Sequence, residues 1–249
     1  MHVPTLQGLI ERRILANYRI DPAVAARVLP APFRPKIHRG YAIAGICLIR
    51  LVHVRPAAMP GPFGIGSENA AHRFAVEWNE NGQTQEGVYI PRRDTSSHLN
   101  ALLGGRLFPG HHHHARFDVT ETDTQLSVAL TSDDNQTSVR VIGCVTDNVP
   151  PDSIFPSLEE ASDFFRRGAL GYSATPAGQQ FDGLELRCDR WDVTPLKVET
   201  IESSFFDDRS IFPAGSITFD CALLMRNISH TWHSREALCC KVGVNATTG

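Results

Sequence analysis

The order of apolar and polar positions along the chain predicts a protein built mainly from strands. Over residues 69–78 the two kinds of position alternate, which places neighbouring side chains on opposite faces of one strand. One face carries Ala71, Arg73, Ala75 and Glu77, and the other carries His72, Phe74, Val76 and Trp78. The aliphatic run 41–54 predicts a buried strand that bends at Gly45. Asn81-Gly82 predicts a hairpin, because both residues tolerate a positive φ.

Three short helices are expected between the strands. Asp21 and Pro22 suit the N-cap and the first position of a helix over residues 23–29. A second helix is expected from residues 95–97 to Leu103, and a third follows the capping box 157–160 and ends at Arg167. Residues 171–183 are polar and rich in glycine, which predicts a loop. Further strands are expected at residues 13–19, 87–91, 116–121, 125–131, 139–146, 184–193, 196–205 and 216–225.

Together these elements predict an α+β fold, a β-rich antiparallel cone or barrel with a few short helices. A parallel sheet is not expected, because strands and helices do not alternate regularly. No linker or change of composition divides the chain, so residues 1–249 are expected to form a single domain.

The composition is that of an ordinary globular protein, with 42% hydrophobic and 20% charged residues. A formal net charge of -3 gives no general electrostatic reason to bind nucleic acid or an anionic membrane. No apolar run approaches the roughly 20 residues that a membrane-spanning helix needs. The N-terminus lacks a basic segment followed by an apolar one, so no signal peptide is expected.

The six cysteines favour reduced thiols and a cytoplasmic location. None forms a C-x-x-C pair, and most lie in apolar, strand-like runs, where a thiol usually serves as a small buried side chain.

Residues 104–114, with the sequence G-G-R-L-F-P-G-H-H-H-H, form the densest group of chemically active side chains. The glycines and the proline predict a turn, and the arginine is a fixed cation. The four imidazoles have ordinary pKa values near neutrality. This segment is therefore predicted to line a pocket.

Several segments resemble proteins with the acetoacetate decarboxylase fold. Residues 14–35, a strand followed by D-P-x-x-x-x-x-x-L-P-x-P-F-x-P, resemble the opening of those proteins. A closer resemblance, over nearly the whole chain, is to the YqjF-like group of uncharacterised bacterial proteins within that superfamily. It rests on A-G-I-C-L-I-R at 44–50, S-E-N-A-A-H-R at 67–73, G-R-L-F-P-G at 105–110 and S-S-F-F at 203–206.

The resemblance implies a cone- or barrel-like β structure around an internal pocket. In acetoacetate decarboxylase a lysine forms a Schiff base with the substrate ketone, and a neighbouring lysine lowers its pKa. That pair follows a Gly-Arg turn, and counting on from Gly105-Arg106 places His113 and His114 at its positions. An imidazole cannot form the iminium that acts as the electron sink. Since Lys36, Lys197 and Lys241 lie in no comparable context, the sequence argues against Schiff-base decarboxylation.

Acid/base chemistry is instead expected from Glu68, His113 and His114. Glu68 corresponds to a glutamate in the family's pocket and would act as a general acid or base if burial raises its pKa. A carboxylate that caps backbone amides at a loop end is the structural alternative for Glu68. A partly structural loop with one inward imidazole is the alternative for the histidines.

Substrate contacts are expected from Arg106, His112 and Tyr89. Arg106 could hold a substrate carboxylate through two hydrogen bonds, or it could fix the turn by pairing with Asp94. His112 and Tyr89 would supply further polar contacts. The prediction includes no metal and no cofactor, although either H-x-H pair within residues 111–114 has a spacing that suits a metal, with Glu68 or His72 as a third ligand.

Three functions remain open. The first is an acid/base enzyme that acts on a small carbonyl- or carboxylate-bearing molecule without a Schiff base. The second is a non-catalytic small-molecule-binding protein, and the third is a metal-dependent hydrolase or lyase that uses residues 111–114. The expected partner is a small-molecule ligand, and a homo-oligomer is left open. Dinucleotide, nucleotide and common serine-hydrolase functions lose support, because G-x-G-x-x-G, P-loop and G-x-S-x-G motifs are absent.

Overall fold

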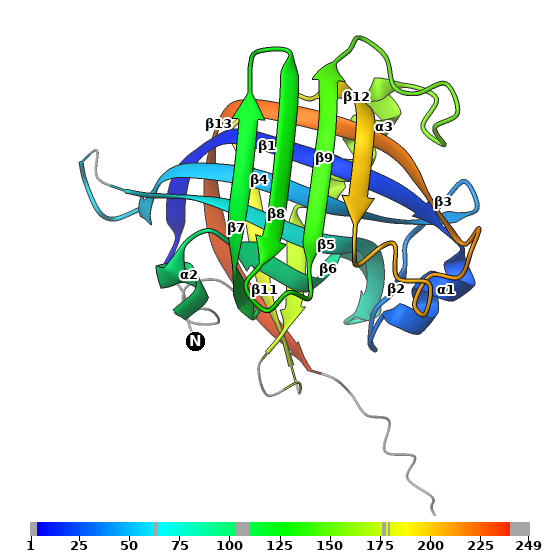
Figure 1. Ribbon diagram of the computed structural model, residues 1–249. Helices are drawn as coiled ribbons and strands as arrows, with labels where there is room; N and C mark the ends of the chain where they lie inside the picture. Colours follow the sequence, from blue (N-terminus) through cyan, green and yellow to red (C-terminus); the bar gives the residue numbers. More distant parts are fainter. Residues whose placement is uncertain (1–3, 62–63, 103–109, 176–177, 179, 240–249) are drawn as a thin grey trace, which may run out of the picture.

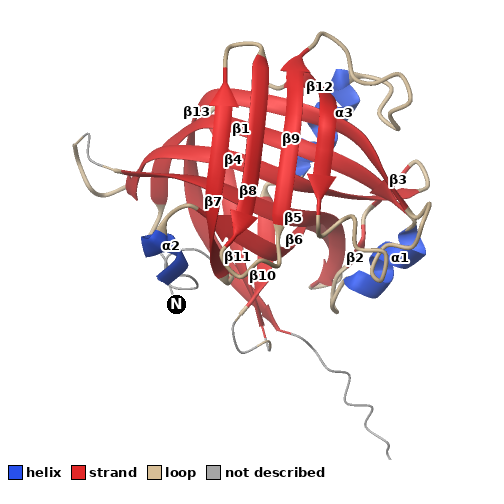
Figure 2. Ribbon diagram, viewed as in Figure 1, coloured by secondary structure: helices blue, strands red, loops and turns tan. Residues whose placement is uncertain are grey.

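The computed structural model describes residues 4–61, 64–102, 110–175, 178 and 180–239. In these ranges the chain forms the strands β1 (Leu6–Ile20), β2 (Arg34–Pro35), β3 (Ile37–His38), β4 (Tyr41–Pro56), β5 (Ile65–Glu80), β6 (Gln83–Thr95), β7 (His112–Glu121), β8 (Gln125–Ser132), β9 (Ser138–Val145), β10 (Leu170–Ala174), β11 (Gln180–Cys188), β12 (Thr194–Ser203) and β13 (Ile217–Cys239). The helices are α1 (Pro22–Val28), α2 (His98–Leu102) and α3 (Leu158–Arg167). Figure 2 shows that strands dominate and that the helices lie at the periphery.

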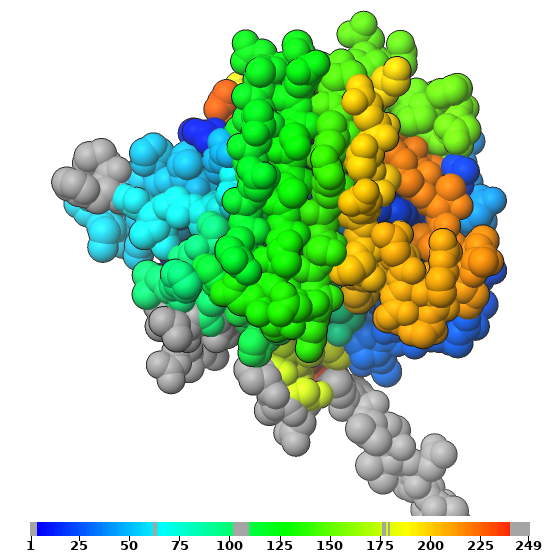
Figure 3. Space-filling view, viewed as in Figure 1, coloured from blue at the N-terminus to red at the C-terminus, as the bar shows by residue number. Residues whose placement is uncertain are grey.

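The strands pair into one cone-like sheet that closes on itself in two ways. One circuit of pairings runs through β6, β7, β8, β9, β12, β13, β1, β4 and β5 and returns to β6. A second circuit runs from β6 through β10 and β11 to β13 and returns along β1, β4 and β5. The five strands β13, β1, β4, β5 and β6 belong to both circuits and are called the shared strands below. Figure 1 shows β7, β8 and β9 crossing in front of them, and Figure 3 shows these three strands as a continuous outer layer.

The shared strands separate two hydrophobic cores. The first core lies between them and β7, β8 and β9, and it includes Phe74, Val128 and Val141. The second core lies on their other face, where α3 contributes Phe165 and β11 contributes Leu186. The position of a residue along its strand decides which of the two cores it joins, since successive side chains of a strand point to opposite faces. The β-rich fold is therefore confirmed, while a single domain over residues 1–249 stays a prediction.

The helices α1 and α3 and the hairpin between β5 and β6 begin where the caps and turn residues in the sequence predicted them. The Asp21 carboxylate accepts hydrogen bonds from the amides of Ala23 and Val24 at the start of α1. The Ser157 hydroxyl accepts one from the Glu160 amide at the start of α3. Asn81 and Gly82 both have positive φ in the hairpin between β5 and β6.

The loop expected over residues 171–183 is wrong, because this segment contains β10 and the start of β11. Gly171 and Gly183 are positions of close approach, whereas Gly178 lies in the turn between the two strands. A Cβ at Gly183 would lie 2.6 Å from the Tyr172 ring, and one at Gly171 would lie 3.0 Å from Ile90 Cδ1. Pairing with β6 and β13, which lie far away in sequence, overrides the polar, glycine-rich composition.

The sheet is mainly antiparallel, but β6 forms short parallel pairings with β7 and with β10. Both pairings are needed to close the circuits, because the two circuits separate at β6 and rejoin at β13. No helix in the described ranges is both long and apolar enough to cross a membrane.

Buried His72 makes the fold sensitive to acid. The side chain is fully buried, and burial lowers its pKa from 6.5 to about 3, with Arg92 acting in the same direction. Below the ordinary histidine pKa the unfolded chain takes up a proton that the folded chain does not, so stability falls as the pH falls. We expect His72 to account for a loss of about 2 kcal/mol in the free energy of unfolding between about pH 7 and about pH 5.

Urea unfolding of the His72→Phe variant over this pH range tests that expectation. The variant should lose less stability on acidification than the wild type. Part of the pH dependence of stability should persist in this variant, since burial also lowers the pKa of His230 to about 4. His53→Asn is the matched control, because His53 is exposed and asparagine tolerates its positive φ. Equal pH dependence in wild type and His72→Phe would contradict the assignment.

Candidate functional site

A cavity of about 100 Å³ lies on the second-core side of the shared strands. Its walls come from β1, β4, β5 and β6, and it is completed by β10, β11, β13 and residues 165–169 at the end of α3. This space holds several water molecules or one small organic molecule. The walls are mainly apolar, with a small set of polar groups, which is the usual composition of a small-molecule site.

Three arginine side chains line the cavity: Arg13 on β1, Arg73 on β5 and Arg93 on β6. Arg13 Nε donates to Cys47 Sγ at 3.3 Å. Arg73 Nη2 donates to Asn17 Oδ1 at 2.5 Å, and its guanidinium lies 5.2 Å from the centre of the Phe165 ring. Arg93 Nε donates to Ser173 Oγ at 3.2 Å.

None of these three guanidiniums forms an ion pair with a carboxylate of the described residues. The sequence outside those ranges contains no Asp or Glu. Burial lowers the pKa of Arg73 to about 10 and that of Arg93 to about 10, because removal from water disfavours the cation. Arg73 is 6% exposed, and its Nε has no hydrogen-bond partner. Such an arrangement leaves buried positive charge available to an anionic ligand.

One carboxylate, Asp94, also lines the cavity, but it is paired with another arginine. Arg92 Nη2 donates to Asp94 Oδ1 at 2.8 Å, and Arg92 also pairs with Asp134 at 3.0 Å. Burial raises the pKa of Asp94, while the hydrogen bond from Arg92 opposes that effect. Asp94 therefore adds a titratable group to the cavity wall without neutralising the three arginines.

Small residues create the space. Cys47 on β4 lies opposite Ala71 on β5, and Gly45 lies opposite Arg73. A Cβ at Gly45 would lie 2.5 Å from the Ala16 carbonyl oxygen, so β1 and β4 approach closely here. Gly168 and Ala169 leave the end of α3 similarly open toward the cavity.

Glu68 lies on the opposite face of β5, outside the cavity. Its carboxylate bridges Arg12 and Arg50, and Arg50 on β4 is the direct cross-strand neighbour of both Arg12 and Glu68. Glu121 on β7 pairs with Arg50 at 2.5 Å and with Arg12 at 3.4 Å. This cluster, named here the ion-pair cluster, fastens β7 to the shared strands and surrounds the fully buried Arg12. The acid or base role of Glu68 stays a prediction.

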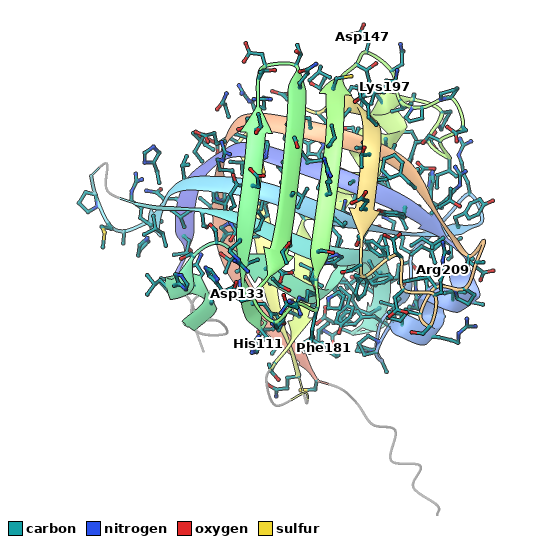
Figure 4. All side chains as sticks on the ribbon, viewed as in Figure 1. His111, Asp133, Asp147, Phe181, Lys197 and Arg209 are labelled. Atoms are coloured by element: carbon teal, nitrogen blue, oxygen red, sulfur yellow. The ribbon has the colours of Figure 1, made fainter. Side chains whose placement is uncertain are left out.

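The side chains of His112, His113 and His114 point in different directions, because these residues are the start of strand β7 and successive side chains of a strand alternate. His112 lines the cavity. His113 Nδ1 lies 2.9 Å from Asp134, and burial lowers its pKa, with Arg92 acting in the same direction. His114 Nδ1 lies 2.7 Å from Asp133, and its ring stacks on His98 at 3.7 Å. Figure 4 places His111 and Asp133 near the same end of the front strands, with Lys197 at the other end. Catalytic roles for His113 and His114 stay predictions.

The other two expected substrate contacts lie elsewhere or are not described. Tyr89 packs in the first core, 5.5 Å from the Phe33 ring and 5.9 Å from the Phe181 ring. Its neighbours Val88 and Ile90 are the residues of that segment that line the cavity. Arg106 lies outside the described residues. No group of three or more His, Cys, Asp or Glu side chains within the described ranges is placed to hold a metal ion.

Sequence reasoning pointed to segments that reach the cavity, and in two of them a neighbour of the named residue lines it. Asn69 lines the cavity beside Glu68, and Val88 and Ile90 line it beside Tyr89. A usable signal was present in the predicted alternation, which places Arg73 on a strand face between two alanines. An arginine flanked by small side chains on a face that becomes buried is a candidate ligand-binding group.

The family model of DUF2071, described as an uncharacterised conserved protein family, matches residues 10–217. No curated protein matches the chain.

Solved structures with the same fold include acetoacetate decarboxylase from Legionella pneumophila, with a TM-score of 0.56 and 12% identity, covering 94% of this chain and 88% of that one. An acetoacetate decarboxylase-like enzyme from Sphingomonas wittichii RW1 has a TM-score of 0.57 and 12% identity, covering 96% and 93%. The enduracididine biosynthesis enzyme MppR in complex with pyruvate has a TM-score of 0.57 and 12% identity, covering 96% and 91%. At these identities the likeness establishes the fold alone, and the expected resemblance to the acetoacetate decarboxylase fold is confirmed.

The ion-pair cluster gives a prediction for Glu68. In the Glu68→Gln variant, Arg12 keeps only its longer contact with Glu121, so a buried cation is left poorly paired. We expect the free energy of unfolding to fall by about 3 kcal/mol in urea denaturation. Glu202→Gln, at an exposed position on β12, is the matched control and should change stability by less than about 0.5 kcal/mol. Equal effects of the two substitutions would show that the cluster does not stabilise the fold.

Proposed function

This chain belongs to the DUF2071 family and has the acetoacetate decarboxylase-like fold, and on that premise we propose that it binds a small carboxylate in its three-arginine cavity. The observation that carries the proposal is the convergence of buried Arg73 and half-buried Arg13 and Arg93 on one cavity, where none of them has a carboxylate partner among the described residues. A ligand carboxylate would accept hydrogen bonds from these guanidiniums and restore their charge balance. The apolar walls favour a ligand with a short carbon skeleton.

Schiff-base chemistry is not part of the proposal. The described residues that line the cavity include no lysine. Lys36 pairs with Glu86 at 2.5 Å and lies over the Phe164 ring. Lys197 is on β12, beside Cys144 of β9, and Lys241 lies outside the described residues. The pyruvate complex of MppR, a protein with the same fold, supports a small carboxylate as the ligand class here.

An acid/base enzyme that acts on the same ligand is the second candidate. Asp94 favours it, because a buried carboxyl group with a raised pKa in a cavity wall can give a proton to a bound ligand. His112 is a second titratable group of that wall. Glu68, His113 and His114 do not line this cavity, so the acid/base roles predicted for them stay separate from this candidate. A cytoplasmic location, suggested by the free cysteines, is likewise proposed, and a homo-oligomer is left open.

Calorimetric titration with pyruvate and with its neutral amide tests carboxylate binding. We expect the carboxylate to bind at least about tenfold more tightly than the amide, because only the anion compensates the buried guanidiniums. Arg13→Gln and Arg93→Gln should each weaken carboxylate binding by about tenfold or more and leave amide binding little changed. Arg190→Gln, at an exposed arginine outside the cavity, should bind as the wild type does. Equal affinity for anion and amide would contradict the proposal.

Borohydride trapping tests the exclusion of Schiff-base chemistry. When the protein is incubated with acetoacetate and sodium borohydride, we expect mass spectrometry to find no lysine reduced onto the ligand, since only an iminium is trapped in this way. A Legionella acetoacetate decarboxylase sample treated in parallel serves as the positive control. Labelling of Lys36, Lys197 or Lys241 in the native protein would overturn the exclusion.

A further inference from the structure

We propose that Cys47 is the nucleophile of the three-arginine cavity and adds to an electrophilic carbon of the bound carboxylate. This inference rests on the proposed function, since the arginines must hold the carboxylate beside the sulfur. It assigns a reaction to the cavity and narrows the ligand class to small acids whose carbonyl carbon is attached to the carboxylate.

The sheet places Cys47 at the centre of the arginines. Cys47 is on β4 between Leu15 of β1 and Ala71 of β5. Arg13 is two residues from Leu15, and Arg73 is two residues from Ala71, so all three side chains lie on one face. Arg93 of β6 is paired directly with Ala71. Cys47 therefore has guanidiniums on both sides along one surface of the cavity.

Contacts of the sulfur agree with this placement. Arg13 Nε donates to Cys47 Sγ at 3.3 Å, so the sulfur already acts as an acceptor toward a cation. Arg73 and Arg93 line the same cavity, so the sulfur lies among cationic side chains.

Two unpartnered donors in the cavity wall point to a ligand at the same place. Arg73 Nε and Trp232 Nε1 are buried atoms without hydrogen-bond partners, and both residues line the same cavity as Cys47. Buried donors are nearly always satisfied, so these two are open to a ligand's oxygen atoms. A carboxylate held by Arg13 and Arg73 would bring its adjacent carbon next to Cys47 Sγ.

The other described cysteines lack this environment. Cys221 is fully buried in the second core, and burial raises the pKa of its thiol. Burial also raises the pKa of Cys188. Cys144 and Cys239 are on β9 and at the end of β13, and neither lines the cavity. Among the described cysteines, only Cys47 lines the cavity.

The reaction that fits these groups is reversible addition of the thiol to a 2-oxo acid. A bond forms between Sγ and the carbonyl carbon, and the π electron pair of the carbonyl moves to its oxygen. The proton lost by the thiol is taken up at that oxygen, which gives a neutral thiohemiketal beside the unchanged carboxylate. No oxidant, reductant or leaving group is required.

Competing alkylation by iodoacetate and iodoacetamide tests the nucleophile on the native full-length protein. Iodoacetate carries the carboxylate that the arginines would hold, whereas iodoacetamide is its neutral counterpart. In both cases Sγ displaces iodide and forms a bond to the methylene carbon. We expect Cys47 to react about tenfold faster with iodoacetate, measured by peptide mass spectrometry. Exposed Cys239 is an internal control and should not share this preference.

Arg13→Gln and Arg93→Gln should each abolish the preference of Cys47 for iodoacetate. Melting curves identify any variant that fails to fold. Pyruvate should slow the labelling of Cys47 in the wild type and leave that of Cys239 unchanged. If neither reagent modifies Cys47 while pyruvate still binds in calorimetry, the nucleophile is refuted and the proposed function stands. If Cys47 reacts without anionic preference and pyruvate does not bind, both proposals are refuted.

Carbon NMR of pyruvate labelled at its carbonyl carbon provides a readout independent of alkylation. In the wild type, part of the bound signal should move from the carbonyl region to that of a tetrahedral carbon. Cys47→Ala should lose the shifted signal, whereas Cys144→Ala should keep it. A shifted signal that persists in Cys47→Ala, or that never forms while pyruvate is bound, would overturn the assignment.

Discussion

Alternation along the shared strands is the constraint on which the rest of the structure depends. Each shared strand belongs to two closed circuits, so its buried side chains alternate between the first core and the second. Arg12 and Arg13 are adjacent in sequence, yet Arg12 enters the ion-pair cluster and Arg13 enters the cavity. Glu68 and Asn69 separate in the same way. The ion-pair cluster and the three-arginine cavity thus lie on opposite faces of the same sheet.

The two groups differ in how their charge is compensated. The Arg12 guanidinium is fully buried and is held by two glutamates, which makes its burial compatible with stability. Arg73 is almost as buried, but its partner is the neutral amide of Asn17. An uncompensated buried cation costs stability, and such costs are usually retained where they serve binding. Neutral anchors such as Asn17 and Ser173 hold the guanidiniums in place without neutralising them.

The fold of this chain does not by itself fix the chemistry of its cavity. The chain has the same fold as acetoacetate decarboxylase at 12% identity, which leaves the polar groups of the cavity free to differ. Here the cavity walls in the described ranges carry arginines and a thiol rather than an amine. A thiol and an amine both add to carbonyl carbon, but only the amine can lose water to form an iminium. The proposed chemistry therefore stops at a reversible adduct.

Much of the fold follows from short-range signals in the sequence. The cap at Asp21, the hairpin at Asn81-Gly82 and the alternation in β5 were all predicted, because each depends on residues a few positions apart. The strand β10 and the start of β11 were missed, since their stability comes from pairing with β6 and β13 rather than from their own composition.

For the site, the sequence by itself pointed to segments that approach the cavity, namely those around residues 68, 89 and 112. Only the tertiary structure decided which residue of each segment faces it. A shift of one position in a strand reverses every side chain, and the register that fixes this position is set by distant partners and by bulges. The same long-range pairing brought Arg13, Cys47, Arg73 and Arg93 together, and no local pattern contains that information.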